Sequence, residues 1–113
     1  GLETFSLTLP GGRSTGGGNS TGVQAGNRFD KENLVLAYQV HRSLVQALDF
    51  ADRGIKRANF AELRDARMPA ILIEGGFMSN PTESKWIYSS AERARLAQAI
   101  VEAVGNFKKA PGL

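Results

Sequence analysis

Glu74 is the residue best placed to do chemistry, because it directly follows a short apolar run and precedes two glycines. Residues 70–73 are apolar and lie between Pro69 and Gly75, a pattern typical of a buried strand. Ligands of open α/β sheets gather at the carboxyl ends of strands, so Glu74 is a candidate general base or activator of a metal-bound water. The alternative is that Glu74 caps the turn or pairs with a nearby arginine.

The only histidine, His41, is the other candidate ligand. It lies on or beside the apolar stripe of a helix that the spacing predicts over residues 31–48. Zinc needs at least three protein ligands, and a chain without cysteine offers only carboxylates as companions. We therefore interpret His41 as a structural residue, and we expect no metal ligand within this chain.

A group of basic residues precedes the apolar run. Its members are Arg53, Lys56, Arg57, Arg64 and Arg67, and they are interleaved with Asp52, Glu62 and Asp65. Such mixed charges are usually solvated and partly paired. Because no nucleic-acid-binding module accompanies them, we do not expect a nucleic acid as partner.

The elements that must position these residues mix strands and helices. Alternation over residues 2–9 predicts a strand with Phe5, Leu7 and Leu9 on one buried face, and shorter strands are expected over 60–64 and 70–74. Amphipathic helices are expected over 31–48 and 91–107. These elements predict an α/β fold in which helices pack on a mainly parallel, twisted sheet.

Two segments are expected to be irregular. Residues 10–28 are rich in Gly, Ser and Thr, which predicts an exposed and mobile surface loop, with a flap at the edge of a substrate site as the alternative. Residues 52–57 are predicted to form a turn with Gly54 as its pivot.

Composition narrows the class of protein. A chain of 113 residues forms one domain at most, and its net charge of +3 suits an anionic polymer without identifying one. The absence of cysteine excludes disulfides and thiolate metal sites within the chain. We expect no membrane-spanning segment and no signal peptide within residues 1–113, so the signal of an exported protein would belong to sequence outside these residues.

Three motifs in order resemble the zinc-dependent N-acetylmuramoyl-L-alanine amidases of the amidase_3 type. They cover residues 52–56, 60–64 and 73–81, the last reading Ile-Glu-Gly-Gly-Phe-Met-Ser-Asn-Pro. Residues 1–5 resemble the Gly-Val-Glu-like strand of that family, and residues 91–107 resemble its final helix. The similarity runs in register through most of the chain.

The resemblance implies a bacterial peptidoglycan hydrolase, an autolysin of the periplasm, cell envelope or extracellular space. It would cleave the amide between the lactyl group of N-acetylmuramic acid and L-alanine. Glu74 falls on the catalytic glutamate of the family. Arg64 falls on an arginine that ends a neighbouring strand, which would bind a substrate carboxylate or orient Glu74.

The chain departs from the family in its metal site. The family binds zinc through a His in a Gly-His-Gly-Gly turn, a Glu, and a second His in a Ser-x-His-x-Asn segment, and none of these is present. We therefore expect the Zn²⁺ ligands upstream of Gly1, and we interpret residues 1–113 as the C-terminal part of one catalytic domain with a phosphorylase/hydrolase-like fold. Its partner would be the missing N-terminal half, and this chain alone would be inactive. The competing hypothesis is a non-catalytic peptidoglycan-binding or regulatory module derived from an amidase.

Overall fold

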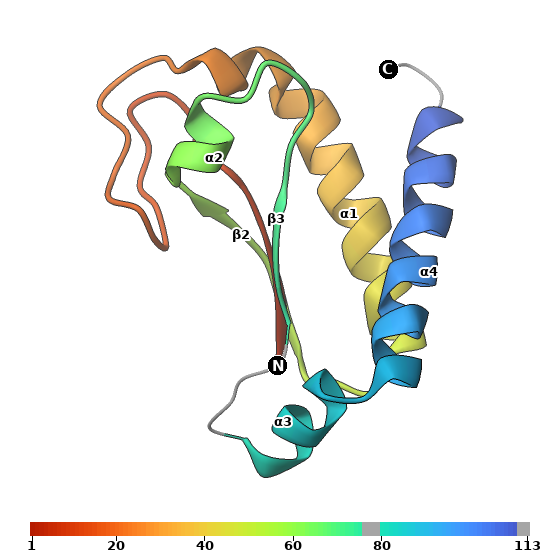
Figure 1. The fold of residues 1–113 in the computed structure, drawn as a ribbon. Helices are drawn as coiled ribbons and strands as arrows, with labels where there is room; N and C mark the ends of the chain where they lie inside the picture. The colour runs from red at the N-terminus through yellow and green to blue at the C-terminus, as the bar shows by residue number, and fades with distance from the viewer. Residues whose placement is uncertain (76–79, 111–113) are drawn as a thin grey trace.

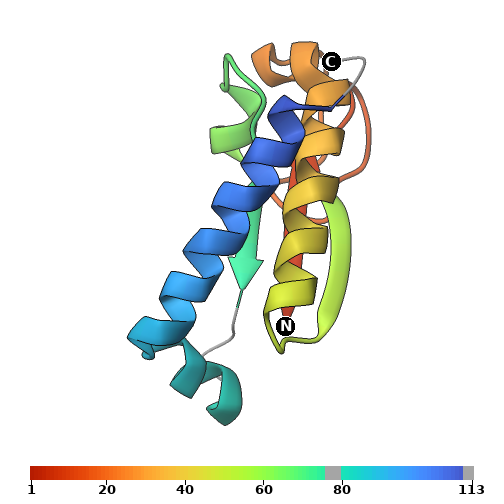
Figure 2. The same cartoon turned by 90° about the vertical axis from the view of Figure 1, so that its right-hand side faces the viewer.

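The structure is a computed structural model that describes residues 1–75 and 80–110. Its elements are β1 (Leu2–Leu7), the 3-10 helix η1 (Ala25–Phe29), α1 (Asp30–Ala47), β2 (Asp52–Ala58), α2 (Ala61–Arg64), β3 (Leu72–Gly75), α3 (Pro81–Ile87) and α4 (Ser90–Lys108). The two long helices lie side by side and cover one face of the sheet (Figures 1 and 2). Helices α1 and α4 therefore confirm the amphipathic helices predicted over 31–48 and 91–107.

The three strands form a mixed sheet in the order β2-β1-β3. β1 is parallel to β2, to which the chain returns after crossing over through α1, as parallel pairing requires. β3 runs antiparallel to β1. The α/β class is thus confirmed, whereas the prediction of a mainly parallel sheet is not, because only one of the two strand pairs among the described residues is parallel.

Two local predictions are wrong. Residues 52–57 form most of β2 rather than a turn, because Gly54 adopts φ = +84° and makes a β-bulge instead of reversing the chain. The expected strand over 60–64 is the single helical turn α2. Its sequence, Ala-Glu-Leu-Arg, consists of strong helix formers, but one turn is too short to show a helical period.

β1 is buried on both faces. On the α1 and α4 side, Leu2 packs with Leu44 and Ala103. On the other side, Phe5 and Leu7 pack with Ala58 and Leu63, as the predicted buried face requires. Leu9, which the alternation places on the same face, is 45% exposed because the strand ends at Leu7.

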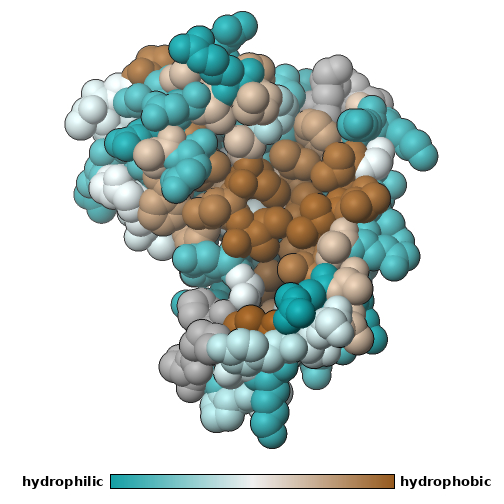
Figure 3. All heavy atoms as spheres, viewed as in Figure 1, coloured by the Kyte–Doolittle hydropathy of each residue, from teal (hydrophilic) through white to brown (hydrophobic). Residues whose placement is uncertain are grey.

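Apolar side chains also gather between β3 and α4 on the face shown in Figure 3. A hollow of about 290 Å³ opens there, with Ile73, Trp86 and Ile100 among its lining residues. The rings of Phe50 and Trp86 meet beside it with their centroids 4.7 Å apart. These contacts join the end of β3 that carries Glu74 to the C-terminal helices.

The glycine-rich loop is mostly exposed, but its backbone is attached to β2. Thr15 N donates to Arg57 O at 2.9 Å, and Asn59 N donates to Gly16 O at 2.9 Å. At Gly17, where φ is +72°, a Cβ atom would lie 2.6 Å from the carbonyl carbon of Asn59. Only glycine therefore allows this close approach.

Candidate active site

Glu74 lies directly opposite Glu3 in the antiparallel pair of β3 and β1. Glu74 is exposed, whereas Glu3 is only 7% exposed because β1 is the central strand. Residues opposed in this way have Cβ atoms about 5 Å apart, so the two side chains can interact. The strand pairing thus brings a solvent-accessible carboxyl and a buried one together.

Glu3 is paired with two cations of β2. Lys56 Nζ donates to Glu3 Oε2 at 2.5 Å, and Arg53 Nε donates to the same oxygen at 3.4 Å. A buried carboxylate is costly unless it is paired, so these contacts are what allow Glu3 to remain ionised inside the sheet. They confirm that the basic group is partly paired: Lys56 and Arg53 pair with Glu3, and Arg57 pairs with Asp30 at 2.8 Å.

The two carboxyls have pKa values that are shifted in opposite directions. The pKa of Glu74 is raised, first by its hydrogen bond with Glu3 and second by partial loss of hydration. The pKa of Glu3 is lowered, chiefly by the hydrogen bond from Lys56. A proton shared by the pair therefore belongs mainly to Glu74, a division of roles typical of acid–base sites.

Arg64 does not join this pair in the way the resemblance implied. It lies in α2, which follows the end of β2 where Ala58 opposes Leu7. Glu74 opposes Glu3 at the other end of β1. In Figure 1, α2 and the N-terminal start of β1 lie at opposite ends of the sheet. The premise that Arg64 ends a strand beside that of Glu74 is therefore wrong, and a contact of Arg64 with substrate stays a prediction.

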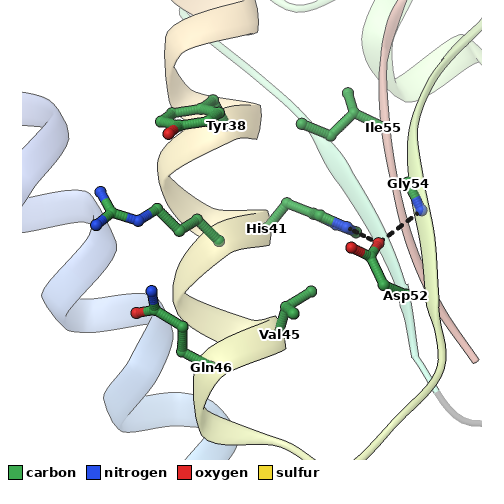
Figure 4. Close-up of a pocket in the computed structure, with 8 residues that line it drawn as sticks. Tyr38, His41, Val45, Gln46, Asp52, Gly54 and Ile55 are labelled. Carbon is green, nitrogen blue, oxygen red and sulfur yellow. Dashed lines mark hydrogen bonds and ion pairs between the residues drawn. The ribbon is translucent and has the colours of Figure 1, made fainter.

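His41 makes contacts that fit the structural role predicted for it. Its Nε2 lies 2.7 Å from Asp52 Oδ1 and its Nδ1 lies 2.9 Å from Thr4 Oγ1. Asp52 also accepts a hydrogen bond from Gly54 N (Figure 4). His41 is buried, and its contacts join α1 to Thr4 of β1 and to Asp52, the first residue of β2.

A hollow of about 390 Å³ lies beside His41, between α1 and β2 (Figure 4). Its lining residues are Tyr38, His41, Arg42, Val45, Gln46, Asp52, Gly54 and Ile55. The polar atoms of His41 and Asp52 are already bonded to each other, and the walls are mainly aliphatic or aromatic. The acid and the base that line this hollow are thus hydrogen-bonded to each other, in contrast to the exposed carboxyl of Glu74.

The described residues do not fit a zinc site. Within 1–75 and 80–110, no three His, Asp or Glu side chains are grouped so that they could hold a metal ion. Both ring nitrogens of His41 are engaged. No chemical step is therefore assigned to a metal bound by these residues.

Sequence reasoning missed Glu3 as part of the site. The predicted strand placed Glu3 on the same face as Phe5 and Leu7, and an acid on a buried face signals a cationic partner. The cationic partners of Glu3 are Arg53 and Lys56. They belong to a segment that the sequence predicts to be a turn, so no neighbouring strand was expected to supply a partner for Glu3. The motif over residues 73–81 is described only in part, because residues 76–79, which include the second glycine, Gly76, lie outside the described residues.

Comparison with known proteins shows the class of this domain. Residues 1–106 match the N-acetylmuramoyl-L-alanine amidase family, Amidase_3. The chain therefore belongs to that family, as the resemblance of its motifs indicated.

Individual relatives support the same family. The chain is 33% identical over 107 residues to an uncharacterized cell wall amidase of Bacillus anthracis, covering 95% of this chain and 18% of that protein. It is 37% identical over 97 residues to the sporulation-specific N-acetylmuramoyl-L-alanine amidase of Bacillus subtilis, covering 81% of this chain and 38% of that protein. The crystal structure of an N-acetylmuramoyl-L-alanine amidase from Clostridium difficile 630 superposes with a TM-score of 0.75 and 31% identity, covering 99% of this chain and 50% of that one.

These coverages mean that the chain spans half or less of the lengths of these amidases. The amidase AmiC2 of Nostoc punctiforme shares the fold with a TM-score of 0.72 at 22% identity, over 97% of this chain and 49% of its own. Across the described parts of the chain, no helix has both the length and the apolar character needed to cross a bilayer.

Proposed function

We propose that this chain carries the general base of a peptidoglycan amidase, and that the base is Glu74. The observation that carries the proposal is the Glu74–Glu3 pair, in which an exposed carboxyl with a raised pKa is held at a strand end. Membership of the amidase family supports the same assignment. The bond cleaved would be the amide between the lactyl group of N-acetylmuramic acid and L-alanine.

In this reaction Glu74 takes a proton from the attacking water as the water oxygen bonds to the amide carbon. The carbon–nitrogen bond then breaks, and Glu74 returns the proton to the leaving amine of L-alanine. Glu74 ends the cycle ionised, so the products are one carboxylic acid and one amine. A raised pKa suits this role because the group must both accept and release a proton near neutral pH.

The family implies zinc, which would polarise the amide carbonyl when bound. Since the described residues supply no ligand set, we propose that the ligands lie outside this chain, upstream of Gly1. The N-terminal half of the catalytic domain would provide them, in the bacterial envelope or outside the cell. This location is supported by relatives that are named as cell wall amidases.

The product of digestion tests this function. The whole protein, with any residues that precede or follow these 113, is incubated with purified peptidoglycan, and the soluble products are identified by mass spectrometry. We expect stem peptides with a free L-alanine amino terminus and glycan strands with unsubstituted lactyl groups. Binding to peptidoglycan without these products would instead support the non-catalytic binding module.

A further inference from the structure

Glu3 occupies an unusual place for an acidic side chain. It lies in the central strand, its side chain is 9% exposed, and it has Glu74 on one side and two cations on the other. Within the described residues, the charged groups that act on Glu74 are Glu3, Lys56 and Arg53. Glu3 opposes Glu74 from β1, and Arg53 and Lys56 approach Glu3 from β2 on its other side.

The bulge at Gly54 is what places both cations on the face of the sheet that carries Glu3. Leu2 pairs with Asp52 and Thr4 pairs with Ile55, so β2 contains one extra residue opposite Glu3. Without the bulge, Arg53 and Ile55 would point to the same face, because side chains alternate along a strand. Instead Ile55 lines the hollow beside His41, while Arg53 and Lys56 both reach Glu3. Bulges commonly redirect side chains in this way next to active sites.

We propose that Glu3 is a positioning residue for Glu74. Held by Lys56 and Arg53, the Glu3 carboxylate fixes the orientation of the Glu74 carboxyl and directs a shared proton onto Glu74. The inference rests on the proposed function because it takes Glu74 to be the general base. The coupling between the two carboxyls, however, can be measured without turnover. The opposite pKa shifts of the two groups support it.

A titration observed by carbon-13 NMR tests the coupling directly. The carboxyl carbons of glutamate are labelled in the whole protein, and the resonances of Glu3 and Glu74 are assigned from variants. In Glu3→Gln we expect the titration midpoint of Glu74 to move to lower pH, because the charge that opposes its ionisation is gone. Glu62→Gln is the matched control, since Glu62 is exposed in α2, and it should leave the midpoint unchanged. A Glu74 midpoint that is the same in Glu3→Gln and in the wild type would overturn the proposal.

A second variant keeps the test sound if Glu3→Gln does not fold. Lys56 is 29% exposed at its side chain, and Lys56→Gln leaves both carboxyls in place. We expect the Glu3 midpoint to rise, because its largest stabilising partner has been removed. An unchanged Glu3 midpoint would show that Lys56 does not hold this carboxylate, which would contradict the proposal.

Kinetics separate positioning from a merely structural role. If Glu3 acts through Glu74, the acid limb of the profile of kcat/KM against pH moves to lower pH in Glu3→Gln. A uniform decrease of kcat/KM with no movement of that limb would count against positioning. Failure of the proposed function would look different, since Glu74→Gln would then retain turnover whatever the two midpoints show.

Discussion

Asp52 of β2 and His41 of α1 are joined by a hydrogen bond of 2.7 Å across the interface between sheet and helix. Because an ionised carboxylate can only accept, His41 Nε2 donates to it, and in the neutral ring Nδ1 then accepts from the Thr4 hydroxyl. Gly54 N donates to the same oxygen of Asp52. One carboxylate therefore links the only histidine to the residue that forms the bulge.

We predict that Asp52→Asn destabilises the protein in a pH-dependent way. The pKa of Asp52 is lowered from 3.8, first by the hydrogen bond from His41 and then by that from Gly54. A lowered pKa in the folded state means that the ionised group stabilises the fold above about pH 3.8, and that this contribution is lost as the pH falls through the folded value. Urea unfolding at several pH values should show a stability difference from the wild type that is largest near neutral pH and shrinks in acid. A difference that grows in acid would contradict this account.

Substitution of Gly54 should reveal the conformational demand of the bulge. Gly54 has φ = +84° and no atom within 4 Å of an added Cβ, so only backbone strain opposes alanine there. We expect Gly54→Ala to lower the free energy of unfolding by about 1–2 kcal/mol. Gly105→Ala is the control, because Gly105 lies within α4 and its Cβ would also meet nothing. That variant should raise stability by about 0.5–1 kcal/mol, and equal effects at both sites would exclude strain as the cause.

Arg64 provides a test of substrate binding away from Glu74. If its guanidinium pairs with a substrate carboxylate, Arg64→Ala should raise KM about tenfold or more with little change in kcat, since hydrogen bonds to charged groups contribute about 1.5–3 kcal/mol. Arg67→Ala, which removes an exposed arginine three positions further on, is the matched control. Unchanged steady-state kinetics in Arg64→Ala would rule out the contact.

The sequence predicted those parts of the fold that a local pattern determines. The helical spacing of apolar residues located α1 and α4 to within one or two residues, and the apolar run before Glu74 located β3. β2 was not recognised, because Gly54 interrupts its alternation and its side chains are mostly charged. The direction of β3 also escaped prediction, since it depends on pairing between distant segments.

The candidate site was predictable to the same extent. Glu74 could be found because it ends an apolar run, whereas its pairing with Glu3 depends on the register between residues about seventy positions apart. The contacts of Glu3 with Arg53 and Lys56 depend in turn on the bulge in β2. The spacing of residues within a single segment does not determine the register between strands. Glu3, Arg53 and Lys56 could therefore be assigned to the site only from the structure.

Replacement of Glu74 by glutamine tests the central claim most directly. The change keeps the size of the side chain but removes its ability to accept a proton, so we predict that Glu74→Gln lowers the kcat for peptidoglycan hydrolysis by about 100-fold or more. Its thermal unfolding should stay close to that of the wild type, because Glu74 is exposed. The measurement is the rate at which L-alanine amino termini are released, with Glu62→Gln as the control. Turnover by folded Glu74→Gln at the wild-type rate would contradict the assignment of Glu74 as the general base.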